Sequence, residues 1–397
     1  MTILADRPDA QFLRPADWTF PVPIAYGPGR LADIAGVCAR LSIARPLIVT
    51  DSGSRALPFV ARLGDLLAAG AIPSAVFAGI SPNPRDDQIA AGCDAYRDGG
   101  HDGIIAIGGG SAMDGAKAIG MTVNSAVPLW DFEYGKPTPD IAPDRRFPPL
   151  VTIPTTAGTG AETESTAMVT DVAQAMKFCI AHPGMRPSLA LLDPELTLGL
   201  PASLTAWTGI DALTHAVEAF TVPGLDPLCD GAALEGLALV ARWLPVALAE
   251  PGNVAARGGM LVGSCLAGVS FLKGLGLVHA ISHMVGAEYD TQHGLTNAII
   301  LPVVMRFNLP GLDDKARRMA QAMGLAQTSP EALIAGIGRL LDQAAIPRSL
   351  AEIGVPLDCA GRIAEKAIQD SAAATNPRAA TVAQIRALTE QAIVRAR

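Results

Sequence analysis

The sequence has no long run of basic residues and no compact set of cysteines. Its 397 residues carry a formal net charge of −8 and a pI of about 5.3, which argues against a nucleic-acid backbone or an anionic membrane surface as partner. The six cysteines lie far apart, and none forms a CxxC pair. We therefore interpret them as reduced core thiols and expect a small molecule as the ligand.

Signals for export and membrane insertion are also missing. The N-terminal segment MTILADRPDAQF lacks a basic region followed by an apolar one. No stretch reaches about eighteen apolar residues without a charge or a run of helix breakers. These absences predict a cytoplasmic protein, and no internal repeat or low-complexity segment argues for another class of protein.

The two halves of the chain differ in their pattern. In the first half, short apolar runs such as PLIVTDSG and GIIAIGGG alternate with helical segments, which predicts a parallel sheet covered by helices. After about residue 196 the chain becomes rich in alanine and leucine with helical periodicity, as in SPEALIAGIGRLLDQAA. We predict an α/β domain over residues 1–196 and an all-helical domain over residues 197–397.

Histidines concentrate in the second half. The stretch from Asp211 to His293 holds four of the six histidines. Asp211 and His215 are four residues apart, as are His279 and His283, so on helices each pair shares one face. One carboxylate and several imidazoles suit a borderline divalent metal, and spacing alone leaves all five side chains as candidate ligands.

A glycine-rich turn in the first half has the composition of a phosphate-binding site. In DGIIAIGGGSAMDGAKAIG, a buried strand leads through three glycines and Ser111 into a helix, whose first N–H groups and dipole favour a phosphate. The spacing is not GxGxxG, so a tight structural turn is an equal alternative. A second turn, IPTTAGTGAETE, offers the hydroxyls of Thr155, Thr156 and Thr159 after another apolar strand.

Asp51 closes the strand PLIVTD. A carboxylate there can accept hydrogen bonds from ribose hydroxyls and repels a 2′-phosphate, which favours NAD over NADP. The alternative is that Asp51 caps the following helix.

These segments together resemble the iron-dependent (group III) alcohol dehydrogenase family. The motifs are SPNP at 81–84, GGGSAMDGAK at 108–117, IPTTAGTGAE at 153–162, TGIDALTHAVE at 208–218, GLGLVHAISH at 274–283, QHG at 292–294 and TNPR at 375–378. The resemblance implies an N-terminal α/β dinucleotide-binding domain and a C-terminal helical domain. It also implies that the metal ligands are Asp211, His215, His279 and His293, with His283 nearby but outside them.

The resemblance further implies NAD as cofactor and hydride transfer to or from a metal-bound short alcohol or aldehyde. The matching cofactor positions are Asp51, Asn83, Gly109, Gly110, Ser111, Asp114, Thr155, Thr156 and Lys177. His283 is our catalytic candidate, as a proton relay or an orienting group, because imidazole titrates near neutral pH. Its alternative is a core histidine paired with a backbone carbonyl group.

Fe²⁺ is the metal implied by resemblance, although this ligand set also accepts Zn²⁺ or another divalent metal.

Lys273, in SFLKGL, has a role that the sequence leaves open. A cation there could receive an anionic group on the aldehyde. The alternative, which we favour slightly, is a solvated lysine that covers apolar surface.

Three rival functions remain open from the sequence. Metal-independent reductases of maleylacetate share the architecture of this family, but the intact set of metal ligands argues against them. Lyases similar to dehydroquinate synthase also combine NAD with a metal, but they are expected to need a more basic pocket. A non-catalytic regulator would be expected to have lost a ligand. A homodimer or larger homo-oligomer is implied by resemblance only.

Overall fold

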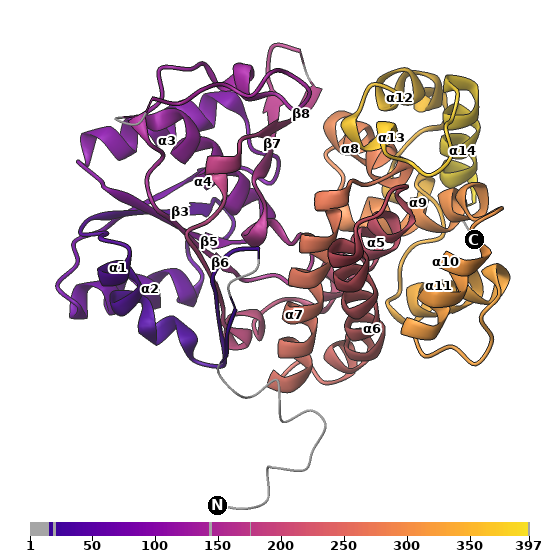
Figure 1. Cartoon of the computed structure of the whole chain (residues 1–397), viewed down its shortest axis with the longest axis horizontal. Helices are drawn as coiled ribbons and strands as arrows, with labels where there is room; N and C mark the ends of the chain where they lie inside the picture. The colour runs from indigo at the N-terminus through magenta and orange to yellow at the C-terminus, as the bar shows by residue number, and fades with distance from the viewer. Residues whose placement is uncertain (1–15, 19–20, 143–144, 175, 396–397) are drawn as a thin grey trace, which may run out of the picture. The chain divides into compact units, whose positions relative to one another are not determined.

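The structure is a computed structural model, and it describes residues 16–18, 21–142, 145–174 and 176–395 (Figure 1). The chain divides into two compact units. The first comprises Met1–Thr156 and Ala161–Gly199, and the second comprises Ala157–Gly160 and Leu200–Arg397. The short segment 157–160 groups with the second unit, although it lies within the sequence of the first.

The first unit is built on a seven-stranded sheet. Across the sheet the strands are β1 (Ala16–Trp18), β2 (Ile24–Tyr26), β9 (Leu189–Leu192), β6 (Leu150–Pro154), β5 (Gly103–Gly108), β3 (Pro46–Asp51) and β4 (Ala75–Ile80). All neighbours are parallel except β1 and β2, which are antiparallel. The predicted parallel sheet is therefore confirmed, with an antiparallel edge that the apolar pattern did not indicate.

Helices cover both faces of this sheet, because alternate residues of a strand point to opposite sides. In β5, Ile104 and Ala106 pack with α3 (Asp86–Asp98) and α4 (Gly110–Val123), whereas Ile105 and Ile107 pack with α1 (Ile34–Arg40) and α2 (Pro58–Ala69). Figure 1 shows these two pairs of helices on opposite sides of the sheet. Burial on both faces explains why the strand sequences are almost continuously apolar.

The strand order changes direction between β3 and β5. From β3, the chain goes to β4 on one side and then returns to β5 on the other. Loops at the carboxyl ends of two such strands diverge and leave room for a ligand. A separate antiparallel hairpin of β7 (Thr166–Asp171) and β8 (Met176–Ala181) follows β6, and the apolar pattern of the sequence does not indicate it.

The second unit is helical, as predicted. Its helices are α5 (Ala202–Thr221), α6 (Pro227–Ala249), α7 (Val254–Ser270), α8 (Leu277–Tyr289), α9 (His293–Asn308), α10 (Asp313–Ala322), α11 (Pro330–Gln343), α12 (Ala360–Ala367), α13 (Ser371–Ala374) and α14 (Val382–Val394). The central helix α5 packs against α6, α7 and α9, and α8 packs against α9 and α12. Side-chain caps begin several helices, such as Ser329 at α11 and Thr381 at α14.

Two helices of this unit, α6 and α7, are long and apolar enough to cross a membrane by length and composition alone. The apolar stretch that contains α7 is 78% buried within the structure, and α6 packs along α7 and α5. Helices in the interior of a globular unit pass the same test. We therefore assign both helices to the packing of the second unit.

Candidate metal centre and cofactor turn

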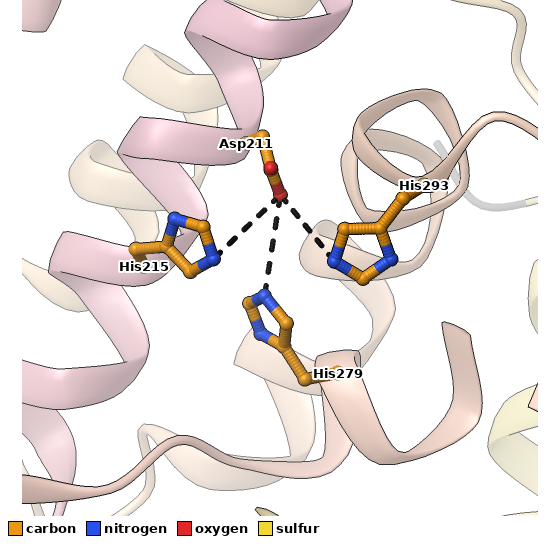
Figure 2. Close-up of side chains that lie close together, drawn as sticks. All are labelled: Asp211, His215, His279 and His293. Carbon is orange, nitrogen blue, oxygen red and sulfur yellow. Dashed lines mark ion pairs between the residues drawn. The ribbon is translucent and has the colours of Figure 1, made fainter. Parts of the chain in front are cut away.

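Four of the five candidate metal ligands point toward one another in the second unit (Figure 2): Asp211, His215, His279 and His293. Asp211 and His215 lie one turn apart on α5, His279 lies in the first turn of α8, and His293 is the first residue of α9. The Nε2 atoms of His215, His279 and His293 lie 3.9, 4.0 and 3.8 Å from Asp211 Oδ1. Three helices thus deliver four donor atoms to one point.

The arrangement of these atoms fits a divalent cation. All four donor atoms lie within 4.8 Å of one another. Ligands about 2.1 Å from a tetrahedral metal would be about 3.4 Å apart, so the distances of 3.8–4.0 Å to Asp211 Oδ1 need to shorten by about half an ångström when a metal binds. A carboxylate oxygen and three imidazole nitrogens form a donor set that iron and zinc both accept.

Each imidazole of this group has a partner at Nδ1, away from Asp211. His215 Nδ1 lies 3.2 Å from the carbonyl oxygen of Gly158, and His293 Nδ1 lies 3.3 Å from Ser282 Oγ. Because a carbonyl oxygen only accepts, His215 carries its proton on Nδ1 and a lone pair on Nε2. Burial lowers the pKa of His215 to about 4, which keeps this ring neutral and its Nε2 available.

Glu218 holds His279 and the start of α8 together. Its Oε2 lies 2.6 Å from His279 Nδ1 and accepts the Gly276 N–H at 3.1 Å, while Oε1 accepts the Val278 N–H at 2.8 Å. The carboxylate therefore caps the positive end of α8 and orients a candidate ligand one residue further on. Burial alone would lower the pKa of His279, but the hydrogen bond and charge of Glu218 raise it.

His283 lies beside the group without joining it. Its Nδ1 is 2.9 Å from Asp370 Oδ2, and its ring stacks on His293 with centroids 5.4 Å apart. The alternative of a histidine paired with a backbone carbonyl group is therefore wrong, because the partner is a carboxylate. Burial alone would raise the pKa of Asp370, but the charge and hydrogen bond of His283 lower it.

A glycine allows α9 to approach α5 at this point. A Cβ atom on Gly294 would overlap the carbonyl oxygen of Trp207 and lie 3.0 Å from Asp211 Cβ. A larger residue would push α9 away and carry His293 with it. The glycine of the QHG motif is therefore explained by close packing between the two helices.

Most of the predicted cofactor residues lie at the carboxyl ends of β3, β5 and β6 or in the first residues of α4, namely Asp51, Gly109, Gly110, Ser111, Asp114, Thr155 and Thr156. Gly108 has a φ of 150°, and a Cβ atom there would lie 3.0 Å from Asp51 Oδ2. The Thr155 N–H donates to the Gly108 carbonyl oxygen at 2.9 Å. The glycine turn, the threonine turn and Asp51 therefore lie side by side at the point where the strand order reverses.

Two hydrogen bonds hold individual residues at this turn. Asp51 Oδ1 accepts the Ser54 N–H at 2.9 Å within a turn, whereas α2 begins after Leu57, so the alternative of Asp51 as a helix cap is wrong. The Ser111 hydroxyl donates to the carbonyl oxygen of Pro82, which ties the glycine turn to the SPNP segment.

The two remaining predicted cofactor residues, Asn83 and Lys177, lie close to each other in the first unit, and Asp114 has partners of its own there. Lys177 Nζ, on β8, lies 3.3 Å from Asn83 Oδ1, after β4. Asp114 accepts the Met168 N–H at 3.2 Å and lies 3.5 Å from the ammonium group of Lys117. Burial raises the pKa of Asp114, and the two nearby lysines oppose that rise. The carboxylate of Asp114 thus has partners within the protein.

Comparison with known proteins decides the family. The sequence matches the iron-containing alcohol dehydrogenase model over residues 21–194 and the C-terminal model of the Fe-containing alcohol dehydrogenase family over residues 205–393. The chain belongs to the iron-containing alcohol dehydrogenase family. It is similar to the NAD-dependent methanol dehydrogenase of Bacillus methanolicus, with 33% identity over 94% of this chain and 98% of the relative.

Further relatives of this alcohol dehydrogenase agree in sequence and in fold. The 1,3-propanediol dehydrogenase of Klebsiella pneumoniae is 36% identical over 95% of this chain and 98% of its own length. A crystal structure of a 1,3-propanediol oxidoreductase superposes with a TM-score of 0.88 at 36% identity, and covers 92% of this chain and 97% of its own. The protein is accordingly an NAD-linked, metal-dependent oxidoreductase of alcohols and aldehydes.

Lys273 differs from both of its predicted roles. Its Nζ lies 2.7 Å from Asp230 Oδ1 on α6, and its side chain is only 5% exposed. The prediction of a solvated lysine is therefore wrong, and the ammonium group already has a carboxylate partner. Its neighbour Phe271, in the 3₁₀ helix η8 (Phe271–Lys273), places its ring 4.8 Å from that of His215.

Sequence reasoning missed two carboxylates at this centre, Glu218 and Asp370. Glu218 stands three residues after His215 on α5, so its place one turn beyond a candidate ligand was a usable signal. Asp370 is 87 residues from His283 in sequence, and only the fold brings the two together.

Proposed function

We propose that Asp211, His215, His279 and His293 hold a divalent metal and that the helical domain predicted over residues 197–397 is the catalytic domain. The observation that carries this proposal is the convergence of three Nε2 atoms on one oxygen of Asp211, with every Nδ1 engaged elsewhere. Fe²⁺ is the metal that the family name indicates, and Zn²⁺ suits the same donors. The bound cation supplies a Lewis acid for the oxygen of the substrate.

The surrounding residues keep the donor atoms in place. Glu218 fixes the ring of His279 and the first turn of α8 through three hydrogen bonds. The carbonyl group of Gly158 fixes His215 in the tautomer that leaves Nε2 free. Such partners of metal-binding histidines reduce the reorganisation that binding would otherwise require.

His283 is our candidate for the residue that moves a proton during the reaction. Asp370 holds its Nδ1, so Nε2 is the ring atom that can exchange a proton with a substrate hydroxyl. Asp370 is itself fixed by the Ala372 N–H at 2.8 Å. The pair therefore resembles a base held by a carboxylate, which sets the tautomer and the orientation of the ring.

The α/β domain predicted over residues 1–196 is proposed to bind NAD. Asp51, the glycine turn and the threonine turn lie together where a parallel sheet reverses its strand order. We assign the ribose to Asp51 and the diphosphate to Gly109, Gly110 and the following helix, with the remaining predicted positions around them. The cofactor supplies the acceptor or donor of hydride.

The substrate is proposed to be a short alcohol or aldehyde. The pairing of Lys273 with Asp230 leaves no free cation at that position for an anionic substrate, and the ring of Phe271 presents an apolar surface next to His215.

We further infer a cytoplasmic protein, since all six cysteines are free. By family likeness we expect a homodimer or a larger homo-oligomer, which light scattering would measure.

The proposal is tested by following NADH oxidation with a panel of short aldehydes, with and without a chelator and after metal is restored. We expect turnover with NADH rather than NADPH, loss of turnover with chelator, and recovery with Fe²⁺ or Zn²⁺. Asp211→Asn should reduce kcat/KM by about 1,000-fold or more, because it removes the negative charge of the carboxylate on which the three Nε2 atoms converge.

His101→Ala serves as the matched control, because His101 lies in the first unit and contacts the Arg45 carbonyl oxygen and Tyr96. It should retain nearly full activity. Turnover that resists the chelator would instead point to a metal-independent reductase. Absence of NADH oxidation with every carbonyl compound would favour a lyase or a regulator.

A further inference from the structure

Asn297 is a buried amide that touches three of the four proposed ligands. It lies one turn after His293 on α9 and has no exposed surface. Its Nδ2 is 2.7 Å from Asp211 Oδ1, 3.1 Å from His279 Nε2 and 3.1 Å from His293 Nε2. The amide nitrogen therefore lies against one face of the group of donor atoms.

The chemistry of these contacts is one-sided. An amide nitrogen donates two hydrogens and offers no lone pair to a metal, so Asn297 Nδ2 is not a fifth ligand. The carboxylate of Asp211 can only accept. The bond to Asp211 is the shortest of the three, and a carboxylate oxygen has further lone pairs, so this bond is compatible with metal binding at the same oxygen.

The carbonyl oxygen of the Asn297 amide gains nothing from its position. Within the described part of the chain, its Oδ1 is buried and has no hydrogen-bond partner. Buried carbonyl oxygens are almost always paired, so an apolar side chain would serve the packing of α9 better here. What the asparagine contributes is its N–H groups.

We propose that Asn297 is a positioning residue of the metal centre, which fixes the carboxylate of Asp211 toward the three imidazoles and so slows the release of the metal. This inference rests on the proposed metal site. Two effects compete, because the same amide also donates toward His279 and His293 and could hinder their use by a metal. The orientation of Asp211 is the larger effect, because one N–H hydrogen of the amide makes the short bond to Asp211. The imidazoles of His279 and His293 share the second hydrogen at longer distances.

The experiment measures metal release from protein loaded with Co²⁺, a spectroscopic substitute for the native metal. A coloured chelator in excess reports the release rate, and the visible absorption of Co²⁺ reports ligand geometry. We expect Asn297→Ala and Asn297→Leu to release the metal about 10–100-fold faster than the wild type and to shift the Co²⁺ bands, as partners of metal ligands generally do.

Thr389→Val is the matched control, because Thr389 is a fully buried polar residue on α14 whose hydroxyl donates to the Ile385 carbonyl oxygen. It should leave the release rate unchanged. The leucine variant fills the space that alanine opens, so agreement between the two separates the lost N–H from a packing defect. Release rates within about twofold of the wild type in both variants would overturn the role of Asn297. If the wild type itself holds no Co²⁺, the proposed metal centre is wrong instead.

Discussion

Glu218 in the second unit and Glu164 in the first are each only 3% exposed, yet their surroundings differ. Both oxygens of Glu218 accept hydrogen bonds, from two backbone N–H groups and from His279. Glu164 has one partner at Oε2, the hydroxyl of Thr166, and within the described residues its Oε1 has none. Donors, and not burial, distinguish these two carboxyl groups.

The difference has a consequence for charge. Burial raises the pKa of Glu164 to about 8 and that of neighbouring Glu162 to about 7, so protonated carboxyl groups persist in the first unit near neutral pH. The charge of Lys117, whose ammonium group donates to the Thr166 carbonyl oxygen at 2.6 Å, opposes this rise but is outweighed by burial. In the second unit, the charge of Glu218 acts on a candidate metal ligand and raises the pKa of His279.

The largest effect is expected from breaking the donor-rich site at Glu218. Glu218→Ala leaves two buried N–H groups and the Nδ1 of His279 without a partner, which should lower the free energy of unfolding by about 3 kcal/mol. It should also weaken metal binding by about 10–100-fold. Urea unfolding and chelator competition measure the two quantities.

Glu235→Ala is the control, since Glu235 is an exposed glutamate on α6 and should change stability by less than about 0.5 kcal/mol. Equal stability losses in the two variants would show that the bonds of Glu218 add nothing. The difference in hydrogen bonding between Glu218 and Glu164 would then have no consequence for stability.

An intermediate effect is expected at the buried ion pair of Lys273 and Asp230 in the helical unit. Asp230→Asn leaves the ammonium group of Lys273 poorly exposed and without a carboxylate, which should cost about 1–3 kcal/mol of stability. Thermal or urea unfolding measures it. In Lys273→Ala, the ratio of kcat/KM for butanal to that for succinic semialdehyde should stay as in the wild type. A ratio that moves several-fold toward butanal would restore Lys273 as a contact for anionic substrates.

At neutral pH the smallest effect is expected for a change at Glu164, whose signature is the pH dependence of stability. A carboxyl group whose pKa is raised on folding stabilises the protein at low pH, and this contribution is lost as pH rises through about 8. Wild-type stability should therefore fall from pH 6 to pH 8.5, with a slope of up to about 1.4 kcal/mol per pH unit for each proton.

Glu164→Gln should flatten that slope, and urea unfolding at the two pH values measures it. Parallel curves for the variant and the wild type would mean that Glu164 is ionised in the folded protein. The contrast with Glu218 would then rest on geometry alone.

Local patterns in the sequence predicted much of this fold and part of the centre. The alternation of apolar runs with helical segments predicted the parallel sheet, but not the β7–β8 hairpin, whose strand MKFCIA is only partly buried and lacks a continuous apolar run. The spacing of Asp211 and His215 placed both on one face of α5. Spacing left five candidate ligands, and resemblance was needed to set His283 apart.

Local sequence patterns sufficed to predict which side chains could bind a metal and which turn could hold a phosphate, because helical spacing and strand-to-helix turns are local properties. The pairing of Lys273 with Asp230, of His283 with Asp370, and of Asn297 with Asp211 depends on packing and was visible only in the folded chain. Each of these contacts joins different helices or loops. These contacts follow from how the helices pack. The close approach of α9 to α5, for example, requires that Gly294 has no side chain.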